Sequence, residues 1–368
     1  MTKIALVPSS YPPSLGGVEE LTRHLALNLV DAGEEVEVWT GTPVDGDPET
    51  AEILDGLVVR RLPMPLPATN WPAVARTATV GRRTLDGLRR AVAAFRPDVL
   101  HVQCFGPNGT YATWLSRRTG IPLVVTLQGE TLMDDADIFE HSRILRTSLR
   151  QGLRRAAAVT ACSAFALTDA EARFGLAPGR GLVIPNGVDT DEGEAHRPGG
   201  GPAPVPEDRP YVFALGRLVR KKGFDLLIDA YALIPEAERD FDVVIAGSGP
   251  ATGELGQQVA ALGLAGRVHL LGRLSRQEVA EAMAGARIFV MPSRLEPFGI
   301  VILEAWRGDV AVIASSSGGA GEFVHDGQDG VLVDPTDVAA LSSALRRLAA
   351  DADWRGRLAA AGHDRVRD

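Results

Sequence analysis

The chain has 368 residues, 45% of them hydrophobic, so it is long enough for two domains that each bury a core. Its net charge of −9 argues against a general nucleic-acid binder, and no apolar run approaches the roughly 18 residues of a membrane span. Two cysteines, Cys104 and Cys162, are too few for a disulfide framework or a zinc site and fit a reducing, cytoplasmic setting.

Short apolar runs alternate with helical patterns along the chain, which predicts an α/β protein with parallel sheets covered on both faces. The first run, after the N-terminal Met1, predicts a strand rather than a signal peptide. The strands predicted in the first half are 3–8, 35–40, 57–62, 99–103, 123–127, 158–162 and 182–185. The rhythm restarts after residue 205, with strands predicted at 211–215, 241–246, 268–271, 288–291, 310–314 and 330–333.

Residues 191–210 have the Gly-, Pro- and charge-rich composition of a linker. We therefore predict two Rossmann-like, doubly wound domains, residues 1–190 and 211–368, joined by this linker. Ligands of such sheets bind at the carboxyl ends of the strands. The expected site is a cleft where these ends of the two sheets face each other.

The first motif with chemical meaning is Gly16-Gly17, which follows the first predicted strand and precedes an amphipathic helix with Leu21, Leu25 and Leu29 on one side. Glycines allow close approach of backbone N–H groups, and a helix N-terminus favours an anion such as a diphosphate. A tight turn with no ligand is the alternative interpretation.

The second motif is Leu215-Gly-Arg-Leu-Val-Arg-Lys-Lys-Gly223, at the end of the first strand of the second half. The chain has only three lysines, and two of them, Lys221 and Lys222, lie here. Arg217 and Lys222 would offer a guanidinium and an ammonium to a diphosphate. A basic surface loop is the alternative, but the place before a helix favours phosphate binding.

The third motif runs from Pro292 to Glu304 after the strand predicted at 288–291. A helix that begins near Gly299 would leave Glu296 in the loop at its mouth and put Glu304 one turn inside, separated by about the reach from sugar to ribose of a nucleotide-sugar. Exposed N–H groups could meet phosphate between them, those of Phe298, Gly299 and Ile300. Glu304 falls in an apolar run and needs a polar partner, although an ordinary acid at a helix edge is the alternative.

These motifs together resemble the retaining glycosyltransferases of family 4, which have the GT-B fold, and the resemblance covers nearly the whole chain. It implies that Glu296 contacts the hydroxyls of the donor sugar and that Glu304 contacts the ribose. It also implies that Arg217 and Lys222 hold the diphosphate, under the Gly16–Gly17 loop. Leu271-Gly-Arg273-Leu274 resembles the loop that meets the nucleotide base.

The resemblance implies metal-independent retention of the anomeric configuration, with no cofactor. The donor would be a nucleotide-sugar, most commonly a UDP-sugar, and the transferred group a hexosyl or N-acetylhexosaminyl group. The sequence names neither the sugar nor the acceptor, which could be a small molecule, a glycan or a lipid-linked compound.

The chain departs from the family pattern at Gln128, where many relatives carry a histidine near the acceptor and the reacting carbon. Glutamine donates and accepts hydrogen bonds but is no base. His101 and Glu130 are further acceptor-side candidates, with His101 interpreted first as a structural residue hydrogen-bonded at a strand end. A second departure is expected at the C-terminus, where the family's helix that crosses back to the first domain looks short or missing.

Residues 141–155 contain five arginines and no acidic residue. Spacings of three and four put Arg143, Arg146, Arg150 and Arg154 on one helical face. Such a face could make weak peripheral contact with an anionic lipid surface. A solvated helix face is the more common case.

Two other functions share much of this pattern. A nucleotide-sugar 2-epimerase would need acid–base residues at the sugar C2 that the sequence does not display. A sugar-nucleotide-binding protein without catalysis is kept open by Gln128, whereas the complete set of phosphate and carboxylate residues argues for transfer.

Overall fold

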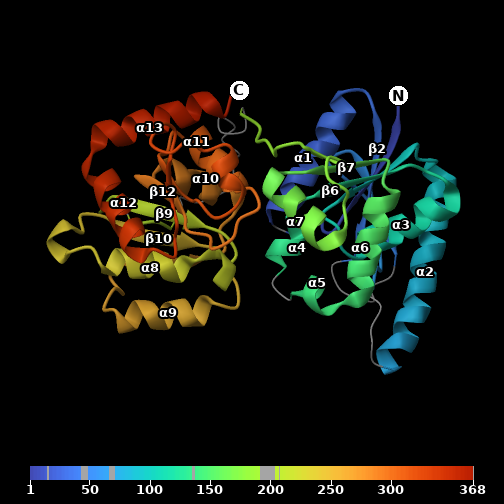
Figure 1. Cartoon of the computed structure of the whole chain (residues 1–368), viewed down its shortest axis with the longest axis horizontal. Helices are drawn as coiled ribbons and strands as arrows, with labels where there is room; N and C mark the ends of the chain where they lie inside the picture. The colour runs from blue at the N-terminus through green and yellow to red at the C-terminus, as the bar shows by residue number, and fades with distance from the viewer. Residues whose placement is uncertain are drawn as a thin grey trace. The chain divides into compact units, whose positions relative to one another are not determined.

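The computed structural model describes residues 1–14, 16–42, 49–65, 71–134, 137–190, 204–206 and 208–367, the stretch 71–78 by its backbone alone. The chain divides into an N-terminal unit, Met1–Asn186, and a C-terminal unit, Gly187–Asp368. Figure 1 colours the first from blue to green and the second from yellow to red. The division falls just before the predicted linker, most of which lies outside the described residues.

The N-terminal unit is built on an eight-stranded sheet with the order β3-β4-β2-β1-β5-β6-β7-β8. Buried aliphatic side chains fill its interior because the central strands are covered on both faces; Leu6, Val38 and Val102 are fully covered or nearly so. The strands are β1 (Lys3–Pro8), β2 (Glu35–Gly41), β3 (Thr50–Leu54), β4 (Leu57–Leu62), β5 (Val99–Gln103), β6 (Leu123–Leu127), β7 (Ala158–Ala161) and β8 (Gly181–Val183).

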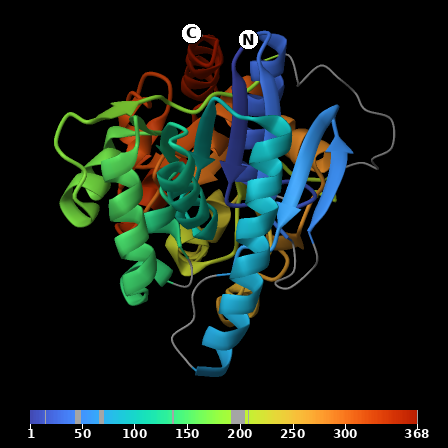
Figure 2. The same ribbon diagram turned by 90° about the vertical axis from the view of Figure 1, so that its right-hand side faces the viewer.

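Strand β3 corrects the predicted all-parallel sheet. It pairs antiparallel with β4, joined to it by Asp55 and Gly56, which both have positive φ. Four of its five residues are exposed, so the segment lacks the apolar pattern that marked the other strands. Figure 2 shows β3 and β4 as the two light-blue strands at the rim of the sheet. An antiparallel strand at the edge of a parallel sheet is common in this class.

Seven helices connect these strands in the residues that the structure describes. Right-handed crossovers place α1 on one face of the sheet and the helices that follow β4 on the other, and Figures 1 and 2 both show α3 between α2 and α6. The helices are α1 (Gly17–Asp31), α2 (Trp71–Phe95), α3 (Pro107–Thr119), α4 (Glu130–Met133), α5 (Ile138–His141), α6 (Arg143–Arg155) and α7 (Ala164–Phe174).

The C-terminal unit has a six-stranded, all-parallel sheet with the order β11-β10-β9-β12-β13-β14. In its core, Val212, Phe241 and Ile288 are fully buried. The strands are β9 (Tyr211–Leu215), β10 (Asp242–Ala246), β11 (Val268–Gly272), β12 (Ile288–Met291), β13 (Val312–Ser315) and β14 (Val331–Val333). All six lie within one or two residues of the predicted runs.

In the described part of the C-terminal unit, six α-helices and three short 3₁₀ turns surround this sheet. Helix α13 packs on α11 so closely that a Cβ on Gly362 would lie 2.2 Å from the Trp306 ring. The elements are η1 (Arg220–Lys222), α8 (Phe224–Ala232), η2 (Glu236–Glu238), α9 (Thr252–Ala261), α10 (Arg276–Ala284), α11 (Ile300–Arg307), η3 (Gly319–Glu322), α12 (Val338–Ala350) and α13 (Ala352–Arg365).

Each sheet has one point at which the winding direction reverses. In the N-terminal unit it lies between β1 and β5, and in the C-terminal unit between β9 and β12. The loops that leave two such strands diverge to opposite faces and leave a crevice at their carboxyl ends, where ligands of doubly wound sheets bind. The loops after β9 and β12 carry the second and third sequence motifs.

Candidate active site

The loop after β9 supports Arg217 and Lys222. Arg217 is exposed and Lys222 half-buried at the end of η1. The loop turns at Gly223, whose φ of 69° lies in the left-handed region, and a Cβ there would lie 1.9 Å from the carbonyl oxygen of Pro292. The backbone after β9 therefore touches the backbone after β12, which only glycine permits.

The loop after β12 carries Glu296, whose residue surface is only 7% exposed. Its backbone is fixed by Gly319 N–H, which donates to the Glu296 carbonyl at 2.8 Å. A Cβ on Gly318 would lie 2.0 Å from the same carbonyl. Glu296 is thus held by its main chain in a loop that has little freedom to move.

Lys222 and Glu296 meet directly: Nζ of Lys222 donates to Oε2 of Glu296 at 2.6 Å. The buried hydroxyl of Ser293 donates to the same oxygen at 3.0 Å. The sequence prediction gave the lysine to the diphosphate and the glutamate to the sugar, without a contact between them. A buried charge needs a partner, and each of these two side chains supplies the other's.

Helix α11 begins at Ile300 after Gly299, which has φ of 93° and makes no side-chain cap. The predicted helix start near Gly299 is therefore confirmed. Phe298 is buried and stacks on Phe323 at 4.7 Å between ring centroids. The N–H groups at the start of α11 thus lie beside the Glu296 loop, and Glu304 is half-buried one turn inside the helix.

The segment Leu271–Leu274 lies at the end of β11, the edge strand beyond β10. Gly272 has φ of 71°, and its carbonyl accepts from Gly247 N–H at 2.7 Å, so the loops after β10 and β11 are adjacent. Arg273 is exposed and Leu271 and Leu274 are half-buried. The segment shares the carboxyl edge with Lys222 but stands two strands from β9.

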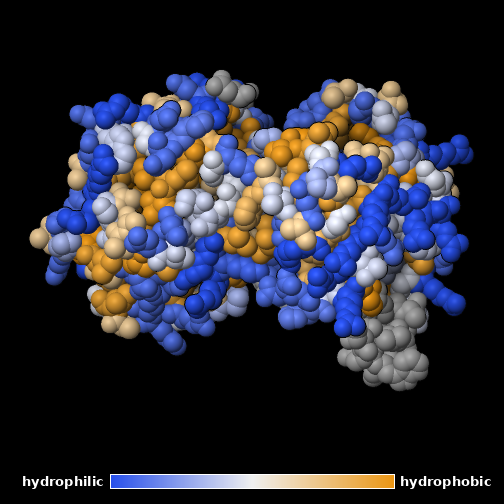
Figure 3. All heavy atoms as spheres, viewed as in Figure 1, coloured by the Kyte–Doolittle hydropathy of each residue, from blue (hydrophilic) through white to orange (hydrophobic). Residues whose placement is uncertain are grey.

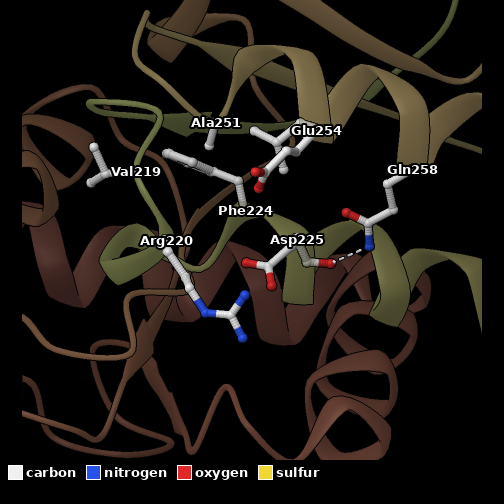
Figure 4. A pocket seen from close by; sticks show the side chains of 8 residues that line it. Val219, Arg220, Phe224, Asp225, Ala251, Glu254 and Gln258 are labelled. Carbon is white, nitrogen blue, oxygen red and sulfur yellow. Dashed lines mark hydrogen bonds between the residues drawn. The ribbon is translucent and has the colours of Figure 1, made fainter.

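A pocket of about 220 Å³ lies on the outer side of the η1 loop, between α8 and α9. Figure 4 shows Arg220, Asp225 and Gln258 among its lining residues. Arg217, Lys222 and Glu296 do not line it. The pocket is therefore a neighbour of the charged pair and not part of it.

In the N-terminal unit, Gly16 and Gly17 are exposed at the start of α1. A Cβ on Gly16 would lie 2.5 Å from Oε2 of Glu19, so a carboxylate of the first helical turn already lies against this backbone. Glu20 follows in the same turn. An anion bound here would meet two negative charges, which reduces the attraction that the helix N-terminus offers.

A chain of neutral hydrogen bonds crosses the ends of β5 and β6. Asn186 donates to Gln128 at 2.9 Å, Gln128 to Gln103 at 3.3 Å, and Gln103 to Nε2 of His101 at 3.0 Å. Since the Gln103 amide donates, Nε2 of His101 accepts and the ring is neutral. Burial lowers the pKa of His101 to about 4, in agreement. Thr126 Oγ1 also lies 2.8 Å from Nε2, so His101 is held at the strand end by hydrogen bonds, as its structural interpretation predicts.

Glu130 joins the loops that follow β5 and β6. Its two carboxylate oxygens accept the backbone N–H groups of Phe105 at 2.6 Å and Gln128 at 2.7 Å. Burial raises the pKa of Glu130 to about 7, although these N–H groups favour the charged form. The carboxylate is thereby directed at the protein's own backbone. Gln103 and Asn186 join the same site but were not predicted, because single amides at strand ends give no sequence signal.

The arginine-rich helix is α6, and its apolar side, Leu145, Leu149 and Leu153, is buried as predicted. Arg143, Arg150 and Arg154 are exposed and Arg146 is half-buried; Figure 3 shows hydrophilic side chains gathered over this helix. Contact of this face with an anionic lipid surface stays a prediction. In the part of the chain that the structure describes, no helix is long and apolar enough to cross a membrane.

Comparison with known proteins agrees with this geometry. "Glycosyl transferases group 1" matches residues 202–365 and "Glycosyl transferase 4-like domain" matches residues 16–187. The chain is 30% identical over 288 residues to alpha-D-kanosaminyltransferase of Streptomyces kanamyceticus, covering 75% of this chain and 73% of that protein. It is 36% identical over 374 residues to GDP-mannose-dependent alpha-(1-6)-phosphatidylinositol monomannoside mannosyltransferase of Mycolicibacterium smegmatis, covering 94% and 89%.

Solved structures share the fold at lower identity. Sucrose-phosphate synthase from Thermosynechococcus elongatus superposes with a TM-score of 0.81 at 23% identity, covering 100% of this chain and 94% of that one. HepE of Anabaena, solved in complex with UDP-glucose, gives a TM-score of 0.75 at 22% identity, with coverage of 100% and 94%. The chain therefore belongs to the family-4 type of glycosyltransferases and has their GT-B fold.

Proposed function

We propose that this glycosyltransferase moves a hexosyl or N-acetylhexosaminyl group from a nucleotide-sugar to an acceptor with retention of the anomeric configuration. The observation that carries the proposal is the contact of 2.6 Å between Lys222 and Glu296 at the switch point of the C-terminal sheet. A cation for the leaving group and a carboxylate for sugar hydroxyls stand side by side there.

The roles follow from the charges. Lys222 and Arg217 would neutralise the diphosphate, whose negative charge grows as the bond to the anomeric carbon breaks, and electrostatic stabilisation acts most strongly on such developing charge. Glu296 would hold sugar hydroxyls and orient the ring. Binding would replace the lysine–glutamate contact by contacts of both groups to the donor. Phe298, Gly299 and Ile300 would offer N–H groups to phosphate, and Glu304 a carboxylate to the ribose.

For the chemical step we propose attack on the face that the diphosphate leaves. The bond between the anomeric carbon and the diphosphate oxygen breaks, the acceptor oxygen bonds to that carbon, and the acceptor proton passes to the diphosphate oxygen. A double displacement would need a carboxylate nucleophile. Glu130 is a poor candidate because backbone N–H groups engage both of its oxygens, and Glu296 is engaged by Lys222.

The donor is best identified by thermal shift with UDP-, GDP- and ADP-sugars. A ligand at a hundred times its dissociation constant adds about 2.7 kcal/mol to stability. The names of similar proteins contain both GDP-mannose and UDP-glucose, so these two lead the screen. If no nucleotide or nucleotide-sugar raised the melting temperature of the protein, the proposal would be contradicted.

Turnover then separates the functions. A transferase forms a glycoside on an acceptor, with an unchanged anomer seen by NMR, and at most slowly hydrolyses its donor alone. A 2-epimerase would interconvert the donor, and a binding protein would leave it intact.

Arg217→Ala and Lys222→Ala should both abolish turnover and weaken the binding of nucleoside diphosphate, measured by calorimetry. Unchanged affinity in both variants would refute the phosphate role, and a glycosyl-enzyme adduct seen by mass spectrometry would refute same-face attack.

A further inference from the structure

Arg294, two residues before Glu296, forms a two-point ion pair with Asp225. Its Nη1 and Nη2 atoms donate to the two carboxylate oxygens of Asp225, each at 2.6 Å. Asp225 lies in the first turn of α8, directly after the loop that carries Lys222. Planar, two-point pairs of this kind are the strong and geometrically specific ones.

The same arginine also donates hydrogen bonds to the backbone carbonyls of the η1 turn. Nη1 of Arg294 donates to the carbonyl of Arg220 at 2.9 Å, and the main-chain N–H of Arg294 donates to the carbonyl of Lys221 at 2.9 Å. Four hydrogen bonds therefore run from one residue of the β12 loop to the β9 loop and the start of α8. They bracket Lys222 in sequence, since their acceptors are residues 220, 221 and 225.

Asp225 is itself fixed from behind. Gln258 of α9 donates to the Asp225 carbonyl at 3.0 Å and to Asp229 at 2.6 Å, as Figure 4 shows for the first of these bonds. The arginine keeps the pKa of the Asp225 carboxyl below its usual range against the opposing effect of burial. The acceptor of the pair is thus a charged group on a braced helix.

We propose that Arg294 is a positioning residue that sets the separation of Lys222 and Glu296 by clamping the loop after β9 to the loop after β12. The inference rests on the proposed function for its effect on catalysis, but the clamp itself is a statement about geometry. Arg294 would act through its neighbours and not on the substrate, because its terminal nitrogens are engaged with Asp225 and Arg220.

An ordinary exposed ion pair contributes little to stability. We expect the loss of the Arg294 pair to matter more, and to lower the rate of catalysis, because it would shift the side chains of the site. Side-chain misplacement of about 1 Å in a catalytic site can lower a rate by about a hundredfold. We expect Arg294→Ala to lower kcat by about 10- to 100-fold with a much smaller change in the donor KM. Arg294→Lys should fall between, because one ammonium cannot reproduce the two-point pair and the bond to the Arg220 carbonyl.

Strand β12 offers a matched control. Arg287 precedes it as Arg294 follows it, and Arg287 also pairs with an aspartate, Asp240, at 2.9 Å, but at the amino end of the strand. Arg287→Ala should leave kcat within about twofold of the wild type if position at the carboxyl edge is what matters. Asp225→Asn should lower kcat in the same direction as Arg294→Ala and by no more, because it weakens the two-point pair but leaves the bond from Arg294 to the Arg220 carbonyl. The double variant should lose little more than Arg294→Ala, because the two changes disrupt one shared interaction.

The scarcity of lysine gives a readout that does not need activity. With lysine labelled selectively with ¹³C, only Lys3, Lys221 and Lys222 contribute side-chain signals. Glu296→Gln identifies the shift of the Lys222 Cε signal that follows loss of its carboxylate. We expect Arg294→Ala to move the Lys222 signal in the same direction, while Lys3 in the N-terminal unit and the whole spectrum of Arg287→Ala stay unchanged.

The possible outcomes distinguish a failure of the positioning role of Arg294 from a failure of the proposed function. An unmoved Lys222 signal in both Arg294→Ala and Arg294→Lys, or a kcat in Arg294→Ala within about twofold of wild type, overturns the positioning role. If Arg294→Ala does not fold, Arg294→Lys and Asp225→Asn carry the same test. If the Lys222 signal moves but the wild type transfers no sugar from any nucleotide-sugar, the clamp stands and the proposed function fails.

Discussion

At the carboxyl edge of the C-terminal sheet, oppositely charged side chains meet: Lys222 lies 2.6 Å from Glu296, and Arg294 clasps Asp225. At the same edge of the N-terminal sheet, a chain of hydrogen bonds between uncharged groups runs from Asn186 through Gln128 and Gln103 to the neutral imidazole of His101. Both sheets wind in the same way and reverse direction beside their first strand, so the fold does not impose this difference.

The difference suggests a division of work between the units. A charged edge held by backbone contacts suits an anionic ligand such as a diphosphate, because charges that are already fixed in place lose no free energy in reorganising. Amides and hydroxyls, which both donate and accept, suit the uncharged hydroxyls of a sugar or an acceptor. Function therefore resides in the loops, and the shared sheet only supports them.

The largest expected effect tests the charged edge. Glu296→Gln should lower kcat/KM by about a thousandfold, because it removes the carboxylate that we propose to orient the sugar and leaves the half-buried Lys222 ammonium without this partner. Initial rates with a saturating acceptor measure it. Glu238→Gln, at an exposed pair with Arg346, is the control and should retain full activity.

A glutamate-to-glutamine substitution in the N-terminal unit tests whether the two sheet edges differ in their importance for activity. Glu130→Gln keeps one accepting oxygen for the backbone N–H groups and should cost far less than Glu296→Gln. Equal losses at the two positions would mean that Glu130 also acts in the chemical step, contrary to the division of work.

The second effect concerns the backbone contact that supports the charged edge. Gly223→Ala puts a Cβ at 1.9 Å from the Pro292 carbonyl oxygen and forces a φ of 69° on alanine, so we expect a loss of about 2–4 kcal/mol in the free energy of unfolding. Gly256→Ala in α9 meets nothing within 4 Å and should be neutral or stabilising by up to about 1 kcal/mol. Urea unfolding of both variants measures the contrast; similar stabilities would show that the two loops are not in rigid contact.

Much of the fold could be predicted from the sequence because buried parallel strands are unbroken apolar runs, as at β9 and β12. Strand β3 could not, since its exposed Thr50–Leu54 segment has no apolar pattern and depends on β4 as a partner.

The motifs of the site were predictable one by one, but their contacts were not. Lys222 and Glu296 are 74 residues apart, and only the strand order places β9 beside β12. The pair Arg294–Asp225 and the amides of Gln103 and Asn186 escaped notice for the same reason: each is unremarkable in sequence and acquires meaning through a neighbour from another loop.

The third effect is a dependence of stability on pH in the N-terminal unit, with opposite signs at two residues. The pKa of Glu130 is raised from 4.5 to about 7, so its contribution is present at low pH and is lost as pH rises through 7. The pKa of His101 is lowered from 6.5 to about 4, so its contribution is present above 6.5 and is lost as pH falls toward 4.

Variants separate the two contributions. Relative to wild type, Glu130→Gln should gain stability as pH rises from 4.5 to 7, and His101→Gln should gain stability as pH falls from 6.5 to 4. Nearby Asp169 adds to the raised pKa of Glu130, so Asp169→Asn is the control that should reduce the first trend. Two difference curves of the same sign would contradict the assignment.

The fourth effect is smaller and tests the chain of uncharged hydrogen-bonding groups at the edge of the N-terminal sheet. Gln128→Ala removes one link between Asn186 and Gln103, and water can replace it because Gln128 is only half-buried. We expect kcat/KM to fall by about tenfold at most, the scale of one neutral hydrogen bond. A loss as large as that of Glu296→Gln would show that the amide takes part in the reaction itself.

The smallest expected effect is that of removing metal. If Lys222, Arg217 and the N–H groups at the start of α11 neutralise the departing diphosphate, a divalent cation has no charge left to balance. Over the described ranges, 1–367 with their gaps, no three metal-ligating side chains cluster. We therefore expect initial rates in excess EDTA to stay within about twofold of those without it. Complete loss of activity that Mg²⁺ or Mn²⁺ restores would show that the cationic side chains do not suffice, and it would move the stabilisation of the leaving group from the protein to a metal ion.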